Sequence, residues 1–142
     1  MSEYTQILLK NDLAEIDRLN QEVAEFGAQH NLTVEEEYAL YLCLEELVTN
    51  VINYAWPEGG EHELNVIVAV NPEEFRIEIE DNGIPFDPTQ YPEPDLSKPP
   101  HERQIGGMGL HLVRKTIDHM SYQRDGDINR LLVRKKRAKV PA

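Results

Sequence analysis

Cysteine is almost absent from this sequence: Cys43 is the only one among 142 residues, so no disulfide can form within the chain. Cys43 lies in an apolar helical pattern, where we expect a small buried side chain rather than a reactive thiol. The sequence also lacks any apolar run of the roughly 20 residues that cross a bilayer. Its first residues lack the basic and then apolar layout of a secretion signal. We therefore expect a reducing, cytoplasmic location and no membrane partner.

Basic residues are scarce, since 14 lysines and arginines face 26 aspartates and glutamates, for a net charge of −12. Proteins that bind nucleic acids concentrate positive charge against the phosphates, so this balance argues against direct nucleic-acid binding. The exception is the segment 128–142, which contains basic residues and no acidic ones. A nucleic-acid arm is one interpretation of this segment. The other, which we favour, is a final strand whose polar face and end are solvated.

The rest of the composition is typical of one domain spanning residues 1–142. Apolar residues make up 40% of the chain and charged residues 28%, which allows a hydrophobic core without metals. Apolar side chains recur at helical spacing between residues 11 and 30, which predicts an amphipathic helix. Thr33 followed by Glu36 forms a capping box, which predicts a second helix that runs to about Ala55.

Alternating residues predict the strands. The runs 64–70 and 75–79 alternate around an Asn-Pro turn and indicate an antiparallel hairpin. The segment 82–106 contains six prolines, and loops of this length are usually functional lids or disordered, so we expect a lid at about 87–105. The other patterns predict a strand at 5–9, a helix at 107–119, and a closing hairpin of strands at 121–125 and 128–135. The expected fold is an α+β two-layer sandwich, with helices on one face of a mainly antiparallel mixed sheet.

The first motif with chemical content lies in the second predicted helix. Glu46 and Asn50 are four residues apart and project from one face, and Asn53 joins them one step further on. An asparagine oxygen is a hard ligand suited to Mg²⁺ alongside phosphates and water. A glutamate one turn earlier can orient or deprotonate an attacking hydroxyl. A helix with a solvated polar stripe is the alternative interpretation.

The second motif follows the predicted strand 75–79, where Asp81 precedes Asn82 and Gly83. A carboxylate at a strand end can accept a hydrogen bond from the exocyclic amine of a purine. The glycine lets a base approach the backbone closely. An ordinary Asn-Gly turn is the alternative.

The third motif opens the helix after the proline-rich loop, with glycines at Gly107 and Gly109. Free amides and the positive end of the helix dipole at this point suit a triphosphate. The motif is neither a P-loop nor the dinucleotide fingerprint, because the residues that should follow the glycines differ. A flexible hinge is the alternative.

The order of these three parts resembles the GHKL ATPases, whose ATP-binding boxes have this order and spacing. The likeness runs from about Thr5 to Lys136 and implies the Bergerat ATP-binding fold. Within that superfamily the chain is similar to the bacterial anti-sigma-factor serine/threonine kinases of partner-switching systems. This likeness rests on Glu-Leu-Val-Thr-Asn at 46–50, Asp-Asn-Gly-x-x-Phe-Asp-Pro at 81–88, and Gly-Gly-x-Gly-Leu-x-Leu-Val-Arg-Lys at 106–115.

The resemblance implies a role for each motif residue. Glu46 corresponds to the general base for a serine hydroxyl, and Asn50 to the Mg²⁺ ligand. Asp81 corresponds to the acceptor for the adenine amine, with Gly83 beneath the base. The residues expected to bind the phosphates are Gly107, Gly109, the backbone amides of Met108 and Leu110, and Arg103 in the lid. These families often have Thr or Ser in the last strand near the adenine, and we place Leu132 at that position.

The resemblance further implies an enzyme that uses ATP and Mg²⁺ to phosphorylate a serine on a STAS-type anti-anti-sigma protein. The same kinase would bind a sigma factor in its alternative state, and a homodimer is possible. A nucleotide-gated binding module without kinase activity is a second interpretation. A detached histidine-kinase ATP domain is a third, although the sequence shows no helix pair bearing a phosphoacceptor histidine.

Overall fold

The computed structural model describes residues 3–92, 97–99, 101 and 107–138. These residues form three α-helices, five β-strands and one short 3-10 helix. In chain order the elements are β1 (Glu3–Lys10), α1 (Glu15–Gln29), α2 (Val34–Tyr54), β2 (Glu63–Val70), β3 (Glu74–Asp81), the 3-10 helix η1 (Pro88–Gln90), α3 (Gly107–Thr116), β4 (His119–Asp125) and β5 (Ile128–Lys136).

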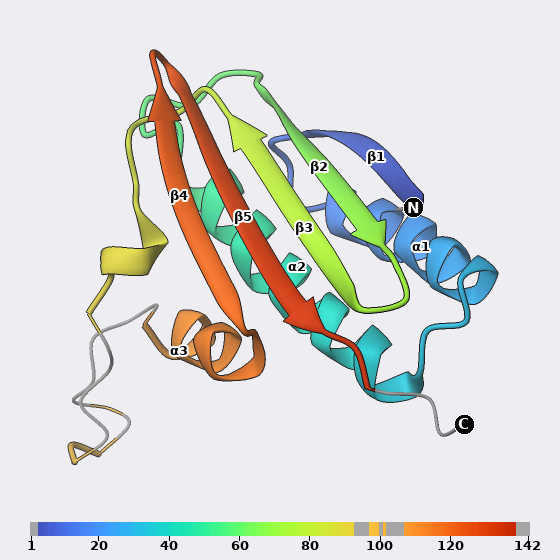
Figure 1. Cartoon of the computed structure of the whole chain (residues 1–142). Helices are drawn as coiled ribbons and strands as arrows, with labels where there is room; N and C mark the ends of the chain where they lie inside the picture. Colours follow the sequence, from blue (N-terminus) through green and yellow to red (C-terminus); the bar gives the residue numbers. More distant parts are fainter. Residues whose placement is uncertain (1–2, 93–96, 100, 102–106, 139–142) are drawn as a thin grey trace.

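The strands form one sheet in the order β1-β2-β3-β5-β4, and all four pairings between them are antiparallel. The chain leaves the sheet after β3, passes through the proline-rich segment and α3, and returns at the edge with β4. The closing hairpin then places β5 against β3. Figure 1 shows the helices gathered on one side of this sheet, which confirms the predicted α+β fold with two layers. The sheet is not mixed as predicted, because all four pairings between the described strands are antiparallel.

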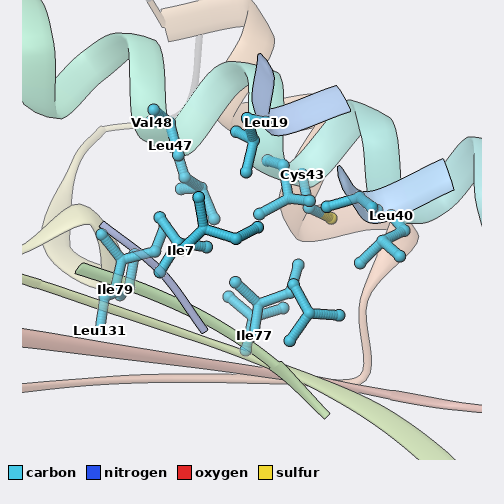
Figure 2. Close-up of a cluster of buried hydrophobic side chains, with 14 of the residues drawn as sticks. Ile7, Leu19, Leu40, Cys43, Leu47, Val48, Ile77, Ile79 and Leu131 are labelled. Carbon is cyan, nitrogen blue, oxygen red and sulfur yellow. The ribbon is translucent and has the colours of Figure 1, made fainter. Parts of the chain in front are cut away.

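The core lies between the sheet and the two long helices. Alternate residues of β3, Phe75, Ile77 and Ile79, are buried, as a strand with one covered face requires. They pack with α2 residues of the same cluster, including Leu40 and Cys43 (Figure 2). Burial raises the pKa of the Cys43 thiol to about 12, which makes the thiolate inaccessible at neutral pH. The expected burial of this cysteine is confirmed.

The two long helices begin at turns formed by polar side chains. The predicted capping box is present, because Thr33 Oγ1 accepts from the Glu36 amide at 3.1 Å and Glu36 Oε1 accepts from the Thr33 amide at 2.9 Å. α1 begins at Glu15, later than expected. The reason is Asp12, whose Oδ1 accepts from the Ala14 amide at 2.9 Å and holds a turn ahead of the helix.

α3 ends at Thr116, three residues before the predicted end, and His119 already begins β4. Asp118 explains the difference, since its backbone amide donates to the Arg134 carbonyl at 3.0 Å. Its side-chain Oδ2 accepts from the Lys136 amide at 2.6 Å. Asp118 is thus already bonded to β5, so the helix cannot continue through it.

The basic segment is largely the last strand, as we favoured, and its arginines pair with carboxylates. Arg130 forms an ion pair with Asp125 and lies 3.5 Å from Glu80. Arg137, beyond the strand, differs from the expected solvated end, because its Nε donates to Glu36 Oε2 at 2.7 Å and both side chains are largely buried. This pair ties the chain after β5 to the first turn of α2.

Replacing Arg137 by alanine should lower the free energy of unfolding by roughly 3 kcal/mol, because Glu36 would remain buried without its cation. Burial raises the pKa of Glu36, but hydrogen bonds from Arg137 and Thr33 outweigh burial and hold this pKa below its ordinary 4.5. The stabilisation is therefore present above pH 4.5 and lost as pH falls through the lowered folded-state pKa. Urea unfolding at neutral and acidic pH measures both effects.

The control is Arg134→Ala, at an exposed position of β5, which should change stability by less than about 0.5 kcal/mol. An equal loss from both variants, or a loss that persists unchanged in acid, would contradict the role of the Glu36 pair.

No helix in the described part of the chain is both long and apolar enough to cross a membrane.

Candidate functional site

A pocket that is partly open to solvent lies between α2 and the strands β3, β4 and β5. Most of its wall is apolar, and its polar groups come chiefly from Asn50, Asp81 and Asn129. The complete lining is Leu47, Asn50, Val51, Tyr54, Ala55, Ile79, Asp81, Ile84, Phe86, Pro88, Tyr122, Asn129 and Leu131. An apolar pocket with a few convergent polar groups is typical of a site for a small ligand.

Asp81 is the last residue of β3 and is only 8% exposed. Its Oδ1 accepts from the backbone amide of Gly83 at 2.8 Å and from Nδ2 of Asn129 at 2.9 Å. Among the described residues, both hydrogen bonds to this carboxylate go to Oδ1. Oδ2 therefore keeps its capacity to accept a hydrogen bond from a ligand in the pocket.

Gly83 is required by the packing of the loop after β3. A Cβ at this position would overlap the Cβ and the carbonyl oxygen of Ala55 at the end of α2. The next amide, of Ile84, donates to the Ala55 carbonyl at 2.8 Å. The glycine thus lets this loop lie directly on the helix end, and both Ala55 and Ile84 line the pocket. The proposed position of Gly83 beneath a base stays a prediction.

Asn50 and Glu46 lie one turn apart on α2, both half-buried. Asn50 lines the pocket, whereas Glu46 lies against the first turn of α3, where a Cβ on Gly109 would overlap its carboxylate. Neither side chain has a hydrogen-bond partner within the part of the chain that the structure describes. The fold therefore brings the first motif next to the third, with Asn50 in the same pocket as Asp81 and Glu46 beside the start of α3.

The third motif opens α3, as predicted, with Gly107 and Met108 as the first two helical residues. The first amides of a helix have no partner within it, so this end can bind an anion. The Leu110 side chain is 1% exposed and belongs to the core, so only its backbone could contact a ligand. Arg103 lies outside the described residues. Phosphate binding at these positions stays a prediction.

Asn53 is not brought together with the other site residues. It is exposed and lines a separate polar groove with Asn11 and His62. The α2 residues that line the pocket are 47, 50, 51 and 54, which have helical spacing. In this set Tyr54, not Asn53, lies one turn after Asn50. Asn50 and Asn53 thus line different hollows, and a role of Asn53 in ATP binding stays a prediction.

Sequence reasoning missed Asn129, which faces Asp81 across the β3–β5 ladder and is 6% exposed. We expected Leu132 at the equivalent place, but strand alternation puts Asn129 and Leu131 on the pocket side and Leu132 on the other face. The signal was available in the run 128–135, because Leu131 and Val133 form its apolar face and Asn129 is in phase with them.

The beginning of the predicted lid is anchored. Asp87 Oδ1 accepts from the Thr89 amide at 2.9 Å and starts the 3-10 helix. Pro88 lines the pocket, and its carbonyl accepts from the Arg114 guanidinium of α3. The Phe86 ring meets the Tyr91 ring edge-on at 6.0 Å. Residues 87–91 thus close one side of the pocket, and much of the remaining lid lies outside the described residues.

Comparison with known proteins agrees with this geometry. A family model described as histidine kinase-like ATPase domain matches residues 9–135. The chain is similar to serine/threonine-protein kinase BtrW of Bordetella bronchiseptica, with 33% identity over 94 residues, 66% of either chain. It is also similar to serine-protein kinase RsbW of Halalkalibacterium halodurans, with 28% identity over 91 residues, 61% of this chain and 55% of the relative. Each aligned segment spans less than two thirds of the relative.

Proposed function

Because the chain belongs to the histidine kinase-like ATPase domain family, we propose that it is an ATP-dependent serine protein kinase. Its substrate would be a STAS-domain anti-anti-sigma protein, and it would also bind a sigma factor. The observation that supports this most is the meeting of the three motifs, with Asp81 and Asn50 in one pocket and Glu46 at the start of α3. The two relatives named serine kinases support the same activity.

In this proposal the adenine occupies the apolar pocket and its amine donates to Oδ2 of Asp81. The phosphates then extend past Asn50 toward the first turn of α3, whose amides and dipole favour negative charge. Asn50 fits a Mg²⁺ ligand, because its side chain is in the pocket wall and makes no hydrogen bond to another described residue. When bound with phosphates and water, Mg²⁺ would neutralise charge on the transferring group.

Glu46 is proposed as the general base. The serine oxygen attacks the γ-phosphorus, the bond from that phosphorus to the β–γ bridging oxygen breaks, and ADP leaves. The serine proton passes to the Glu46 carboxylate, which has no competing hydrogen bond within the described structure. Catalysis in such a site is mostly positioning and charge stabilisation, so the contact between Glu46 and the Gly109 turn matters for placing the base near the phosphates.

The experiment incubates the protein with γ-labelled ATP, Mg²⁺ and extract of the source cell, and then tests the label for acid stability. We expect acid-stable label on a small second protein, because phosphoserine survives acid. Acid-labile label would indicate transfer to histidine or aspartate and overturn the proposal. Intact ATP binding without label would overturn kinase activity and favour a nucleotide-gated binding module.

A further inference from the structure

We propose that Asn129 is a positioning residue that makes the pocket selective for 6-amino purines over 6-oxo purines. This inference rests on the proposed nucleotide site and deepens it. Asn129 comes from the closing β4–β5 hairpin and contacts the base-recognising carboxylate from the neighbouring strand β5. The hairpin would thus determine which base the pocket accepts.

The Asn129 amide is fully used within the protein. Its Nδ2 donates to Asp81 Oδ1 at 2.9 Å and to the Ile84 carbonyl at 2.9 Å. Its Oδ1 accepts from the Tyr122 hydroxyl and from Arg124 Nη1 at 3.0 Å. A side-chain amide has two donor hydrogens and two acceptor lone pairs, so no capacity remains for a ligand. Asn129 must therefore act on a bound base through Asp81.

The segment that follows Asp81 is held from two sides. Arg124 Nη1 donates to the Gly83 carbonyl at 2.7 Å, and Asn129 holds the Ile84 carbonyl. From the other side the Ile84 amide donates to the Ala55 carbonyl at the end of α2, and the backbone at Gly83 lies so close to Ala55 that a Cβ would overlap it. The carboxylate is thus fixed at its backbone as well as at Oδ1.

The consequence for base selection is a fixed acceptor. The Gly83 amide and Asn129 Nδ2 both donate to Oδ1 of Asp81, which fixes the orientation of the carboxylate. In this proposal Oδ2 is therefore the oxygen that accepts a hydrogen bond from a base in the pocket. A base with an amine at C6 offers the matching donor. A base with a carbonyl at C6 places the lone pairs of that oxygen against Oδ2, and neither atom can donate a hydrogen bond. Both acceptors would stay unpaired in a buried site, which lowers the affinity for such a base. Removing the Asn129 donor frees the carboxylate to rotate, and the discrimination weakens.

The test compares binding of ADP and of inosine diphosphate by calorimetry, since neither can donate a γ-phosphate. The wild-type protein should prefer ADP strongly, and Asn129→Ala should reduce the ratio of the two affinities by about tenfold, mainly through weaker ADP binding. The matched control is Arg130→Ala, the next residue of β5, whose exposed side chain pairs with Asp125 and Glu80. This control should leave the ratio unchanged.

A second variant covers the case in which Asn129→Ala does not fold. Arg124→Gln removes the bonds to Asn129 and to the Gly83 carbonyl from a half-buried position and should lower the ratio by about threefold. An unchanged ratio in the folded variants, or equal wild-type affinity for both nucleotides, would overturn the selectivity role while leaving the nucleotide site in place. Failure of the wild-type protein to bind either nucleotide would overturn the proposed function and this inference together.

Discussion

Glu46→Gln should lower the rate of phosphate transfer to the partner serine by about a thousandfold, while ATP still binds. Glutamine has the shape of glutamate, so the contact with the Gly109 turn is retained, but the amide cannot accept the serine proton at neutral pH. The expected loss is therefore in kcat rather than in the affinity for ATP. Single-turnover labelling of the purified partner, together with calorimetry for ATP, separates these two quantities.

The matched control is Glu45→Gln, which removes the same charge from the adjacent, exposed position of α2. It should transfer phosphate at the wild-type rate, because one step along a helix turns the side chain away from the face that Glu46 occupies. Equal losses in both variants would show that the effect comes from the charge of the helix surface. Full activity of Glu46→Gln would remove Glu46 from the chemistry and leave positioning by Asn50 and the α3 amides as the source of catalysis.

Local patterns allowed much of the fold to be predicted. The capping box of Thr33 and Glu36 involves residues three apart, and both hairpins join strands through short turns. Each of these features is determined by neighbours in sequence, which periodicity and turn chemistry describe well. The boundaries failed where a distant partner intervened, as at Asp118, which bonds to β5 and ends α3 early.

The site was harder to predict for the same reason. Asp81 and Asn129 are 48 residues apart, and their hydrogen bond depends on the register between β3 and β5, which no local pattern specifies. The contact between Glu46 and Gly109 likewise depends on how α3 packs against α2. Asn53 shows the converse case, because its spacing on α2 looked suitable and only the tertiary structure placed it in a different groove.

Asp81→Asn should weaken binding of adenine nucleotides by roughly a hundredfold, because a charge-assisted hydrogen bond is lost and a mismatch replaces it. The oxygen of the new side-chain amide would keep the bonds from Gly83 and Asn129, since those donors approach Oδ1 of Asp81. The NH₂ group of that amide would then face the pocket and meet the adenine amine donor to donor. Calorimetry with ADP measures the loss, and the shift in melting temperature on adding ADP provides an independent measure.

Glu80→Gln is the control, because Glu80 precedes Asp81 on β3 and its side chain lies on the opposite face, near Arg130. It should bind ADP as the wild-type protein does. If Asp81 served only the turn with Gly83, Asp81→Asn would lower stability and leave the affinity of the folded protein for ADP unchanged. Loss of both binding and transfer in Asp81→Asn, against loss of transfer alone in Glu46→Gln, would assign base recognition to the end of β3 and proton acceptance to α2.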